Sequence, residues 1–278
     1  MTRARLEIGL LATLLWFGAV AAAVPMPSRG LCAHRGDGKS FPENTVPALV
    51  SAARKGAAMV EFDVLRCKTG ELVVMHDATV DRTTDGTGKV AELTFAEIRA
   101  LDAGKKKDAR FAGVKVPTFD EAIDCLPREG IWINIDCGEG VAADVARAIR
   151  DKGRLHQAFV AAPLADIATA RAAVPEVLAC NMSRTGAWGH PWTREETLAY
   201  VTNTANARCQ FMQLIAPCEA EDLKLIHQVG GKVNYTMEDT PERARLRFAQ
   251  GVDFVLTNDL DALRPILNDE RETDKGGL

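Results

Sequence analysis

The sequence lacks a long run of basic residues. Its longest, Lys105-Lys106-Lys107, stands in a chain whose formal net charge is −4 at pH 7. A nucleic-acid-binding protein needs a cationic surface to neutralise phosphates. Nucleic acid is therefore excluded as a main partner.

Two further motifs are missing. No Cys-x-x-Cys pair occurs and no cysteine has a histidine at zinc-site spacing, which argues against a zinc ribbon. No Gly-x-Gly-x-x-Gly follows the first expected strand, which argues against an open dinucleotide-binding sheet. With 47% hydrophobic and 26% charged residues, the chain has the composition of a globular protein with a substantial core.

Long apolar stretches are also scarce, except at the start. Arg3 and Arg5 precede a mainly apolar run from Ile8 to Val20, and three alanines follow it. This order is typical of a secretory signal peptide, and the run is shorter than the ~20 residues that span a bilayer. We expect residues 1–24 to be a cleaved leader and residues 25–278 to be an exported domain, periplasmic or extracellular, without a stable membrane span. An uncleaved membrane anchor is the alternative.

Seven cysteines are present. In an exported protein this number allows at least one disulfide and leaves one cysteine over, with the pairing open. Cys32 and Cys67 also fit as small buried side chains on strands. The oligomeric state is open as well.

Short β-rich apolar runs alternate with segments of helical period along most of the chain. About eight repeats of strand and helix predict a TIM (β/α)8 barrel with its active site at the C-terminal ends of the strands. The expected strands are 30–33, 59–65, 72–76, 131–136, 158–161, 177–181, 211–215, 232–236 and 254–257. The later helices are expected at 165–173, 194–205, 220–228, 241–249 and 260–267.

One segment interrupts this rhythm. Residues 77–116 are polar, punctuated by glycine and weakly periodic, and they are too long for an ordinary connection between strand and helix. We expect a small inserted subdomain beside the active-site face.

Ionisable residues stand where the first strands end. His34 follows the first strand, and His76 ends the short strand after the second. Glu61 and Asp63 lie two residues apart, so a strand directs both carboxylates to the same side. Two neighbouring carboxylates repel each other unless a cation lies between them.

A third carboxylate, Asp136, ends the strand Ile133-Asn134-Ile135-Asp136. Three oxygen ligands suit one divalent cation, Ca²⁺ or Mg²⁺, better than zinc or copper. Each acid alone could equally be a solvated strand end or a salt-bridge partner.

A series of motifs resembles the amino-terminal half of the glycerophosphodiester phosphodiesterase family. They are His34-Arg35-Gly36, Pro42-Glu43-Asn44-Thr45, Glu61-Phe62-Asp63-Val64, Val74-Met75-His76-Asp77, Asp81 to Gly88, Leu101 to Gly104 and Val116 to Phe119. The carboxy-terminal half matches more weakly, through Val233 to Thr236, Gly251 to Asp253 and Thr257-Asn258.

The resemblance implies a TIM barrel with a small insertion that hydrolyses glycerophosphodiesters, small-molecule substrates, to sn-glycerol 3-phosphate and an alcohol. The roles it implies are general acid and base for His34 and His76, phosphate binding for Arg35, metal binding for Glu61, Asp63 and Asp136, support for Glu43, and substrate stacking for Tyr235, where the family usually has tryptophan. These roles suit the chemistry, because arginine binds phosphate oxygens in pairs and histidine transfers protons near neutral pH.

The chain departs from the family pattern after the third acid. The family usually has a lysine two residues on, directed toward phosphate, and this chain has Gly138; the acid itself is aspartate where glutamate is common. The loss keeps two alternatives open. One is a barrel that binds phosphodiesters without cleaving them, and the other is a phospholipase D-like enzyme acting on lysolipid headgroups.

Overall fold

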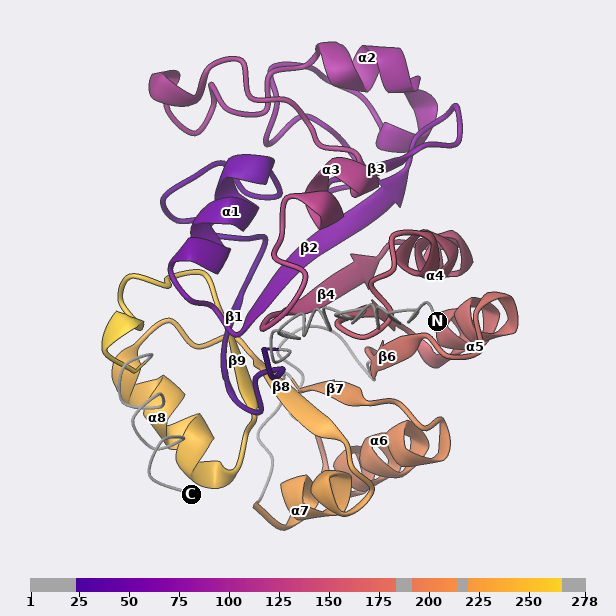
Figure 1. Cartoon of the computed structure of the whole chain (residues 1–278), viewed down its shortest axis with the longest axis vertical. Coiled ribbons are helices and arrows are strands. Elements are labelled where there is room, and N and C mark those ends of the chain that lie inside the picture. The colour runs from indigo at the N-terminus through magenta and orange to yellow at the C-terminus, as the bar shows by residue number, and fades with distance from the viewer. Residues whose placement is uncertain (1–23, 184–191, 215–219, 267–278) are drawn as a thin grey trace, which may run out of the picture.

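The computed structural model describes residues 24–183, 192–214 and 220–266 (Figure 1). Eight parallel strands pair in sequence and close into a barrel because β1 pairs with both β9 and β2. The strands of the barrel are β1 (Gly30–Ala33), β2 (Met59–Arg66), β4 (Trp132–Cys137), β5 (Ala158–Ala162), β6 (Leu178–Asn181), β7 (Phe211–Leu214), β8 (Lys232–Thr236) and β9 (Phe254–Thr257). The fold class predicted from the sequence is confirmed.

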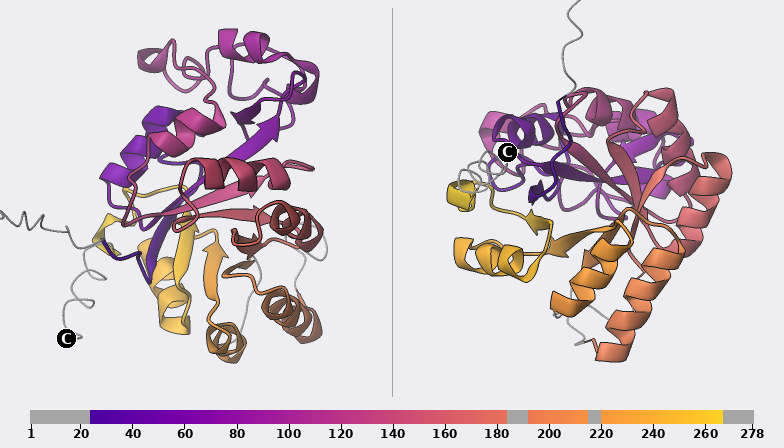
Figure 2. Two further views of the ribbon diagram at one scale, coloured as in Figure 1. Left: turned by 45° about the vertical axis from the view of Figure 1, so that its right-hand side comes forward. Right: turned by 60° about the horizontal axis from the view of Figure 1, so that its bottom comes forward.

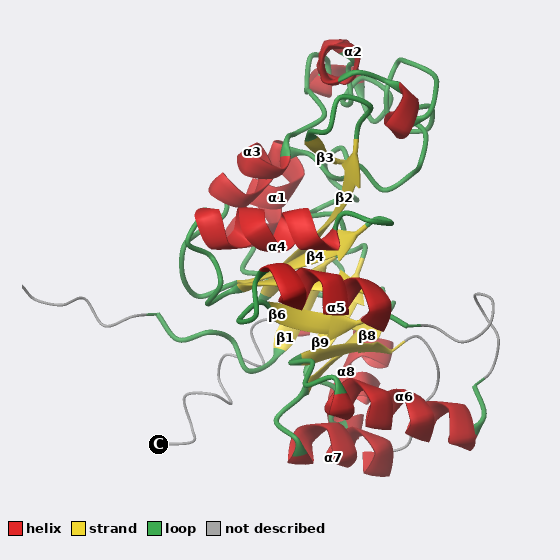
Figure 3. Ribbon diagram, turned by 90° about the vertical axis from the view of Figure 1, so that its right-hand side faces the viewer, coloured by secondary structure: helices red, strands yellow, loops and turns green. Residues whose placement is uncertain are grey.

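Helices surround the strands, as the two views of Figure 2 show. They are α1 (Val46–Arg54), α3 (Phe119–Asp124), α4 (Ala142–Asp151), α5 (Leu164–Ala173), α6 (Arg194–Asn206), α7 (Ala220–Gln228) and α8 (Pro241–Gln250). Thr118 and Thr193 form capping boxes at the starts of α3 and α6, which satisfy backbone donors that the first turn leaves free. Figure 3 shows α4 and α5 side by side over the sheet.

Two hydrophobic clusters hold the barrel. The inner one fills the space enclosed by the strands, where the rings of Phe159 and Phe211 stack with their centroids 4.1 Å apart. The outer one packs the other face of the strands against the helices. Strands buried on both faces read as continuous apolar runs, which is why the sequence located them well.

The inserted segment leaves the barrel after β2. Strand β3 (Leu72–Val74) pairs antiparallel with the end of β2, and a loop region with the short helices η1 (Val90–Glu92), α2 (Phe95–Ala100) and η2 (Ala109–Phe111) follows. This region forms the upper part of Figure 1. It has a separate small core that includes Val73, Val80, Ile98 and Val116.

Some predictions differ from the structure or fall outside it. Strand β3 ends at Val74, two residues before the predicted end at His76. Residues 260–263, predicted helical, form turns, and residues 264–266 are helical. The leader predicted at residues 1–24 lies outside the described residues except for Val24. No helix in the described part of the chain is both long and apolar enough to cross a bilayer.

Candidate active site

The ionisable residues found in the sequence gather at the C-terminal ends of the barrel strands. His34 follows β1, Glu61 and Asp63 lie in β2, and Asp136 lies near the end of β4. Parallel pairing of β2 with β4 sets Asp63 directly beside Asp136. The strand register therefore converts a sequence separation of about seventy residues into one cluster.

Three carboxylates meet in this cluster. One oxygen each of Glu61, Asp63 and Asp136 lies within 4.8 Å of the other two. Ligands of one Ca²⁺ ion, each 2.3–2.6 Å from the metal, are at most about 5.2 Å apart. Burial first, and then the charges of Asp63 and Asp136, raise the pKa of Glu61 well above its ordinary value. Both the spacing of the oxygens and their mutual repulsion fit a bound hard cation.

Arg35 links this cluster to the loop after β1. Its backbone lies in the left-handed region with φ 54°, and its N–H donates to Glu61 Oε2 at 2.7 Å. Its guanidinium donates to Glu43 Oε1 at 2.8 Å, and its Nε lies 3.5 Å from Asp63 Oδ2. Gly36 continues the tight turn, since a Cβ there would lie 2.7 Å from the backbone of Ala48.

Glu43 is an ionised bridge between two arginines. It accepts hydrogen bonds from Arg35 and, through both oxygens, from Arg82 at 2.7 Å. Although burial opposes the charged form, the hydrogen bonds from Arg82 and Arg35 lower the pKa of Glu43 to about 2. Glu43 thereby supports Arg35 at the site.

Asn44 holds one of the carboxylates from two directions. Its Nδ2 donates to Asp63 Oδ2 at 2.7 Å, and its Oδ1 accepts from the Asp63 N–H at 3.2 Å. Asn44 is buried and has φ 57°, a conformation that asparagine tolerates better than most residues. Asn44 therefore fixes the orientation of a predicted metal ligand.

The two histidines have different partners. Nδ1 of His34 lies 2.7 Å from Oδ1 of Asn258, and Nδ1 of His76 lies 2.6 Å from Oδ1 of Asp77. Burial is the main cause that lowers the pKa of His34. Arg82 donates two hydrogen bonds to Asp77, and these lower the pKa of that carboxyl.

A hollow of about 410 Å³ opens beside His34. It is lined by His34, Arg35, Gly38, Lys39, Glu43, Asp239, Asn258 and Asp259. His76 lines an adjoining hollow that shares Glu43. Lys39, whose ammonium pairs with Asp259, brings a second cation to the wall of the main hollow.

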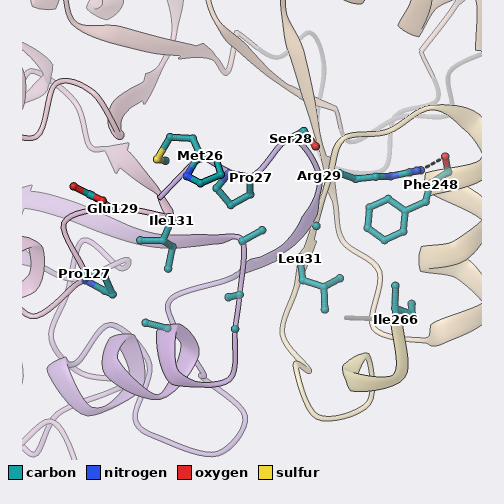
Figure 4. A pocket seen from close by; sticks show the side chains of 17 residues that line it. Met26, Pro27, Ser28, Arg29, Leu31, Pro127, Glu129, Ile131, Phe248 and Ile266 are labelled. Carbon is teal, nitrogen blue, oxygen red and sulfur yellow. Dashed lines mark hydrogen bonds between the residues drawn. The ribbon is translucent and has the colours of Figure 1, made fainter. Parts of the chain in front are cut away.

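A larger hollow of about 550 Å³ lies at the opposite end of the barrel (Figure 4). Its walls come from the segment before β1 and from residues such as Ile131 and Phe248. Arg29 is directed toward Phe248, donates to its carbonyl and lies over its ring. This hollow lacks the histidines and clustered acids, and it lies at the end of the barrel where enzymes of this fold do not carry their chemistry.

The structure corrects the expectation for Tyr235. This residue lies on β8, only 4% of it is exposed, and the guanidinium of Arg247 in α8 covers its ring at 4.1 Å. Its neighbour Asn234 is buried beside Cys32 of the barrel interior, so the alternation of the strand turns Tyr235 toward the helices. A tyrosine packed in this layer is structural and does not stack on substrate.

Gly138, which stands where the lysine was expected, is half-buried against the end of β2. A Cβ at this position would lie 2.4 Å from Leu65 Cδ2 and 3.1 Å from the Val64 carbonyl oxygen. Leu65 thus fills the space that the base of a longer side chain would need.

Sequence reasoning assigned no role to four residues at the site. These are Lys39, Asn44, Arg82 and Asn258. Asn44, Arg82 and Asn258 stand inside motifs that the chain shares with the family. Their position in a motif could therefore have indicated a role at the site. Lys39 carried no signal, because a single exposed lysine in a loop is unremarkable.

Comparison with known proteins places these observations in a family. The model of the glycerophosphoryl diester phosphodiesterase family matches residues 34–262. A glycerophosphodiester phosphodiesterase of Caldanaerobacter subterraneus subsp. tengcongensis is 46% identical over 109 residues, which are 39% of this chain and 45% of that relative. Glycerophosphodiester phosphodiesterase 1 of Bos taurus is 48% identical over 97 residues, 34% of this chain and 29% of that relative. The matched stretches thus span less than half of these relatives.

Solved structures share the fold over most of the chain. A glycerophosphodiester phosphodiesterase of Agrobacterium tumefaciens superposes with a TM-score of 0.71 at 24% identity, covering 85% of this chain and 99% of that one. An Oleispira antarctica phosphodiesterase, solved in complex with its product sn-glycerol 3-phosphate, gives a TM-score of 0.73 at 24% identity and covers 86% and 96%. The match of the family model covers well over half of the sequence, so the chain belongs to the glycerophosphoryl diester phosphodiesterase family.

Proposed function

We propose that the chain is an exported, metal-dependent phosphodiesterase that hydrolyses glycerophosphodiesters to sn-glycerol 3-phosphate and an alcohol. The observation that carries the proposal is the meeting of three carboxylates within 4.8 Å of one another beside Arg35, in a site that also holds His34 and His76. The family membership and the product bound to the Oleispira antarctica phosphodiesterase support the same substrate class.

Glu61, Asp63 and Asp136 would hold one divalent cation, Ca²⁺ or Mg²⁺. When bound, such an ion neutralises the charge on phosphoryl oxygens. Arg35 would bind the phosphate as well, because it lines the main hollow beside His34 and a guanidinium binds phosphate oxygens in pairs.

The hydrogen-bond partners of the two histidines indicate which proton each histidine would transfer. His34 is held by a neutral amide in a site whose burial disfavours its cation, so we assign it the general base of the first step. His76 is held by the carboxylate of Asp77, whose charge complements an imidazolium, so we assign it the general acid.

Two displacements complete the reaction. The neighbouring glycerol hydroxyl loses its proton to His34 and attacks phosphorus, while the P–O bond to the alcohol breaks and His76 protonates the departing oxygen. Water then gives a proton to His76 and attacks phosphorus, and His34 returns its proton to the glycerol oxygen as the cyclic phosphate opens. Both histidines regain their starting protonation, and the products are sn-glycerol 3-phosphate and the alcohol.

The export part of the proposal rests on residues 1–24, where two arginines precede an apolar run and three alanines. The full chain, produced with its leader in a bacterial host, should be recovered outside the cytoplasm with a new amino-terminus near residue 25. Amino-terminal sequencing checks this expectation. Retention of Met1 on cytoplasmic protein would contradict it.

Turnover is tested with the purified protein. Glycerophosphocholine and glycerophosphoethanolamine should yield sn-glycerol 3-phosphate with Ca²⁺ or Mg²⁺, EDTA should abolish the product, and His34→Ala should reduce the rate by at least about a hundredfold, the usual scale of general acid–base catalysis. His156→Ala is the matched control, because His156 lies away from the site and contacts the Arg128 carbonyl.

Gly138 favours one competing function, a barrel that binds phosphodiesters without cleaving them. Calorimetric binding of glycerophosphocholine without any turnover, whatever the metal, would establish this alternative. If the protein neither binds nor hydrolyses glycerophosphodiesters, both of these functions are wrong. Lysolipid headgroups would then be the substrates to examine.

A further inference from the structure

A chain of hydrogen bonds leads from His34 to the loops that follow β9 and β8. Asn258, directly after β9, places Oδ1 2.7 Å from Nδ1 of His34. Its Nδ2 lies 3.1 Å from Oδ2 of Asp239 and 2.9 Å from Sδ of Met237. All four residues sit on the loops that leave neighbouring strands β8, β9 and β1, and three of them, His34, Asp239 and Asn258, line the main hollow.

Asp239 is itself anchored. Its Oδ1 accepts from the backbone N–H of Asn258 at 2.8 Å and from the hydroxyl of Thr257 at 2.9 Å. With the bond to Oδ2, three donors from the end of β9 converge on this carboxylate. Asp239 is thereby fixed against the segment whose amide it contacts, although it is exposed to solvent.

These contacts determine which way the Asn258 amide faces. A carboxylate can only accept hydrogen bonds and a thioether is a weak acceptor, so the side of the amide facing Asp239 and Met237 must carry the NH₂ group. Turning the amide over would set its carbonyl oxygen 3.1 Å from a carboxylate oxygen, where both carry negative charge. The oxygen therefore faces His34.

The orientation of the amide in turn selects the tautomer of His34. Opposite a carbonyl oxygen, Nδ1 must carry the proton, and the lone pair of the neutral ring is then on Nε2. We infer that Asp239 and Asn258 are positioning residues that fix His34 in the Nδ1–H tautomer and so keep Nε2 as its basic nitrogen. The inference about the tautomer stands on the contacts alone, and its catalytic meaning rests on the proposed function.

The tautomer can be measured without any activity. In the uniformly ¹⁵N-labelled full chain at pH 8, long-range ¹H–¹⁵N spectra distinguish protonated from unprotonated ring nitrogens, and the His34→Asn variant identifies the His34 signals. We expect Nδ1 protonated and Nε2 unprotonated in His34. The reverse pattern in the wild-type protein would overturn the inference whether or not any variant folds.

Asp239→Ala removes the group that orients the amide. Asn258 can then turn its NH₂ toward His34, so the signals should shift to or toward the Nε2–H tautomer, and kcat should fall by about tenfold to a hundredfold, the scale found for residues that orient ligating histidines. KM should change little, because Asp239 does not contact the phosphate-binding residues. Asp261→Ala is the matched control, since Asp261 lies on the loop after β9, three residues after Asn258, and pairs with Lys55.

A double variant distinguishes loss of the His34 orientation from general damage to the site. Aspartate at position 258 has only acceptor atoms, so Asp239→Ala combined with Asn258→Asp should restore the Nδ1–H tautomer and most of kcat. Asn258→Asp alone sets the new carboxylate beside that of Asp239, so this single variant should have a lower kcat than the double variant. An unchanged tautomer in Asp239→Ala, or no recovery in the double variant, would overturn the inference. Failure of all variants and the wild type to turn over substrate, with the expected tautomers intact, would instead count against the proposed function.

Discussion

Asn44 shows how one uncharged side chain can orient a carboxylate of the candidate metal site. It contacts Asp63 through both ends of its amide, and it is buried, so no solvent molecule replaces it at low cost. Partners that orient metal ligands typically affect metal affinity or activity by about 10-fold to 100-fold. We predict that Asn44→Ala weakens Ca²⁺ or Mg²⁺ binding by this factor, as measured by calorimetric titration.

Asn203→Ala provides the comparison for this prediction, because Asn203 is exposed on α6 and removed from the carboxylates. It should bind metal as the wild type does. Equal affinities of the Asn44 and Asn203 variants would show that the Asn44 contacts do not orient Asp63.

Glu43 adds a pH dependence of its own. Its pKa is lowered to about 2 by Arg82 and Arg35 in spite of burial. A carboxyl with a depressed pKa stabilises the folded state above its unfolded pKa, and this contribution is lost as the pH falls toward 2. The ion-pair network around Glu43 is therefore complete throughout the neutral range, in which the proposed proton transfers by His34 and His76 would take place.

At the scale of elements, the strands were predictable and the details of the site were not. Strands such as β5 and β9 are buried along their whole length and so appear as unbroken apolar runs. Two of the three candidate metal ligands, Glu61 and Asp63, could be proposed from the sequence because the period of two in β2 places them on one side. The expectation for Tyr235 rested on its place in a family motif and did not take account of the period of two in β8. That period turns the Tyr235 side chain toward α8.

The connection after β4 explains the missing lysine. Gly138 does not have a positive φ, so steric contact alone limits this position, and Leu65 Cδ2 would lie 2.4 Å from a Cβ. Overpacking typically costs about 1–3 kcal/mol, and the cost here belongs at the low end, because Leu65 Cδ2 is the end of a half-buried side chain that can turn away. We predict that Gly138→Ala lowers the free energy of unfolding by such an amount, as measured by urea denaturation.

Leu65→Ala removes the side chain that meets the new Cβ. Gly138→Ala should then cost clearly less in the Leu65→Ala background than in the wild type, so the two substitutions should not be additive. Additive effects would show that the contact with the Val64 carbonyl, rather than with Leu65, limits position 138.

At the scale of the whole molecule, closure of the barrel assembles the site. His34 and Asn258 are 224 residues apart and meet because β1 pairs with β9. Local pattern in a sequence shows the periodicity of each strand but not which strand ends become neighbours. The partners of His34 therefore became visible only in the closed barrel, whereas the histidine itself was evident from its motif.

Closure also places three carboxylates in one buried region, which costs stability when no cation is present. Burial and the charges of Asp63 and Asp136 raise the pKa of Glu61, so the folded state holds this proton more tightly than the unfolded state does. The stability of the metal-free protein should then fall as the pH rises from the ordinary pKa of glutamate toward the raised one. Replacing Glu61 by glutamine removes this dependence, because an amide does not titrate.

We therefore predict opposite effects of Glu61→Gln in two conditions. In EDTA at pH 8 the variant should be at least as stable as the wild type toward urea, with a smaller advantage at pH 5, where Glu43 and Asp77 are still ionised. With metal at a hundred times its dissociation constant, the wild type should gain about 2.7 kcal/mol and the variant much less. A wild type that gains nothing from any divalent cation, together with a variant that is less stable in EDTA at both pH values, would mean that the carboxylates stabilise one another through the protein alone and do not form a metal site.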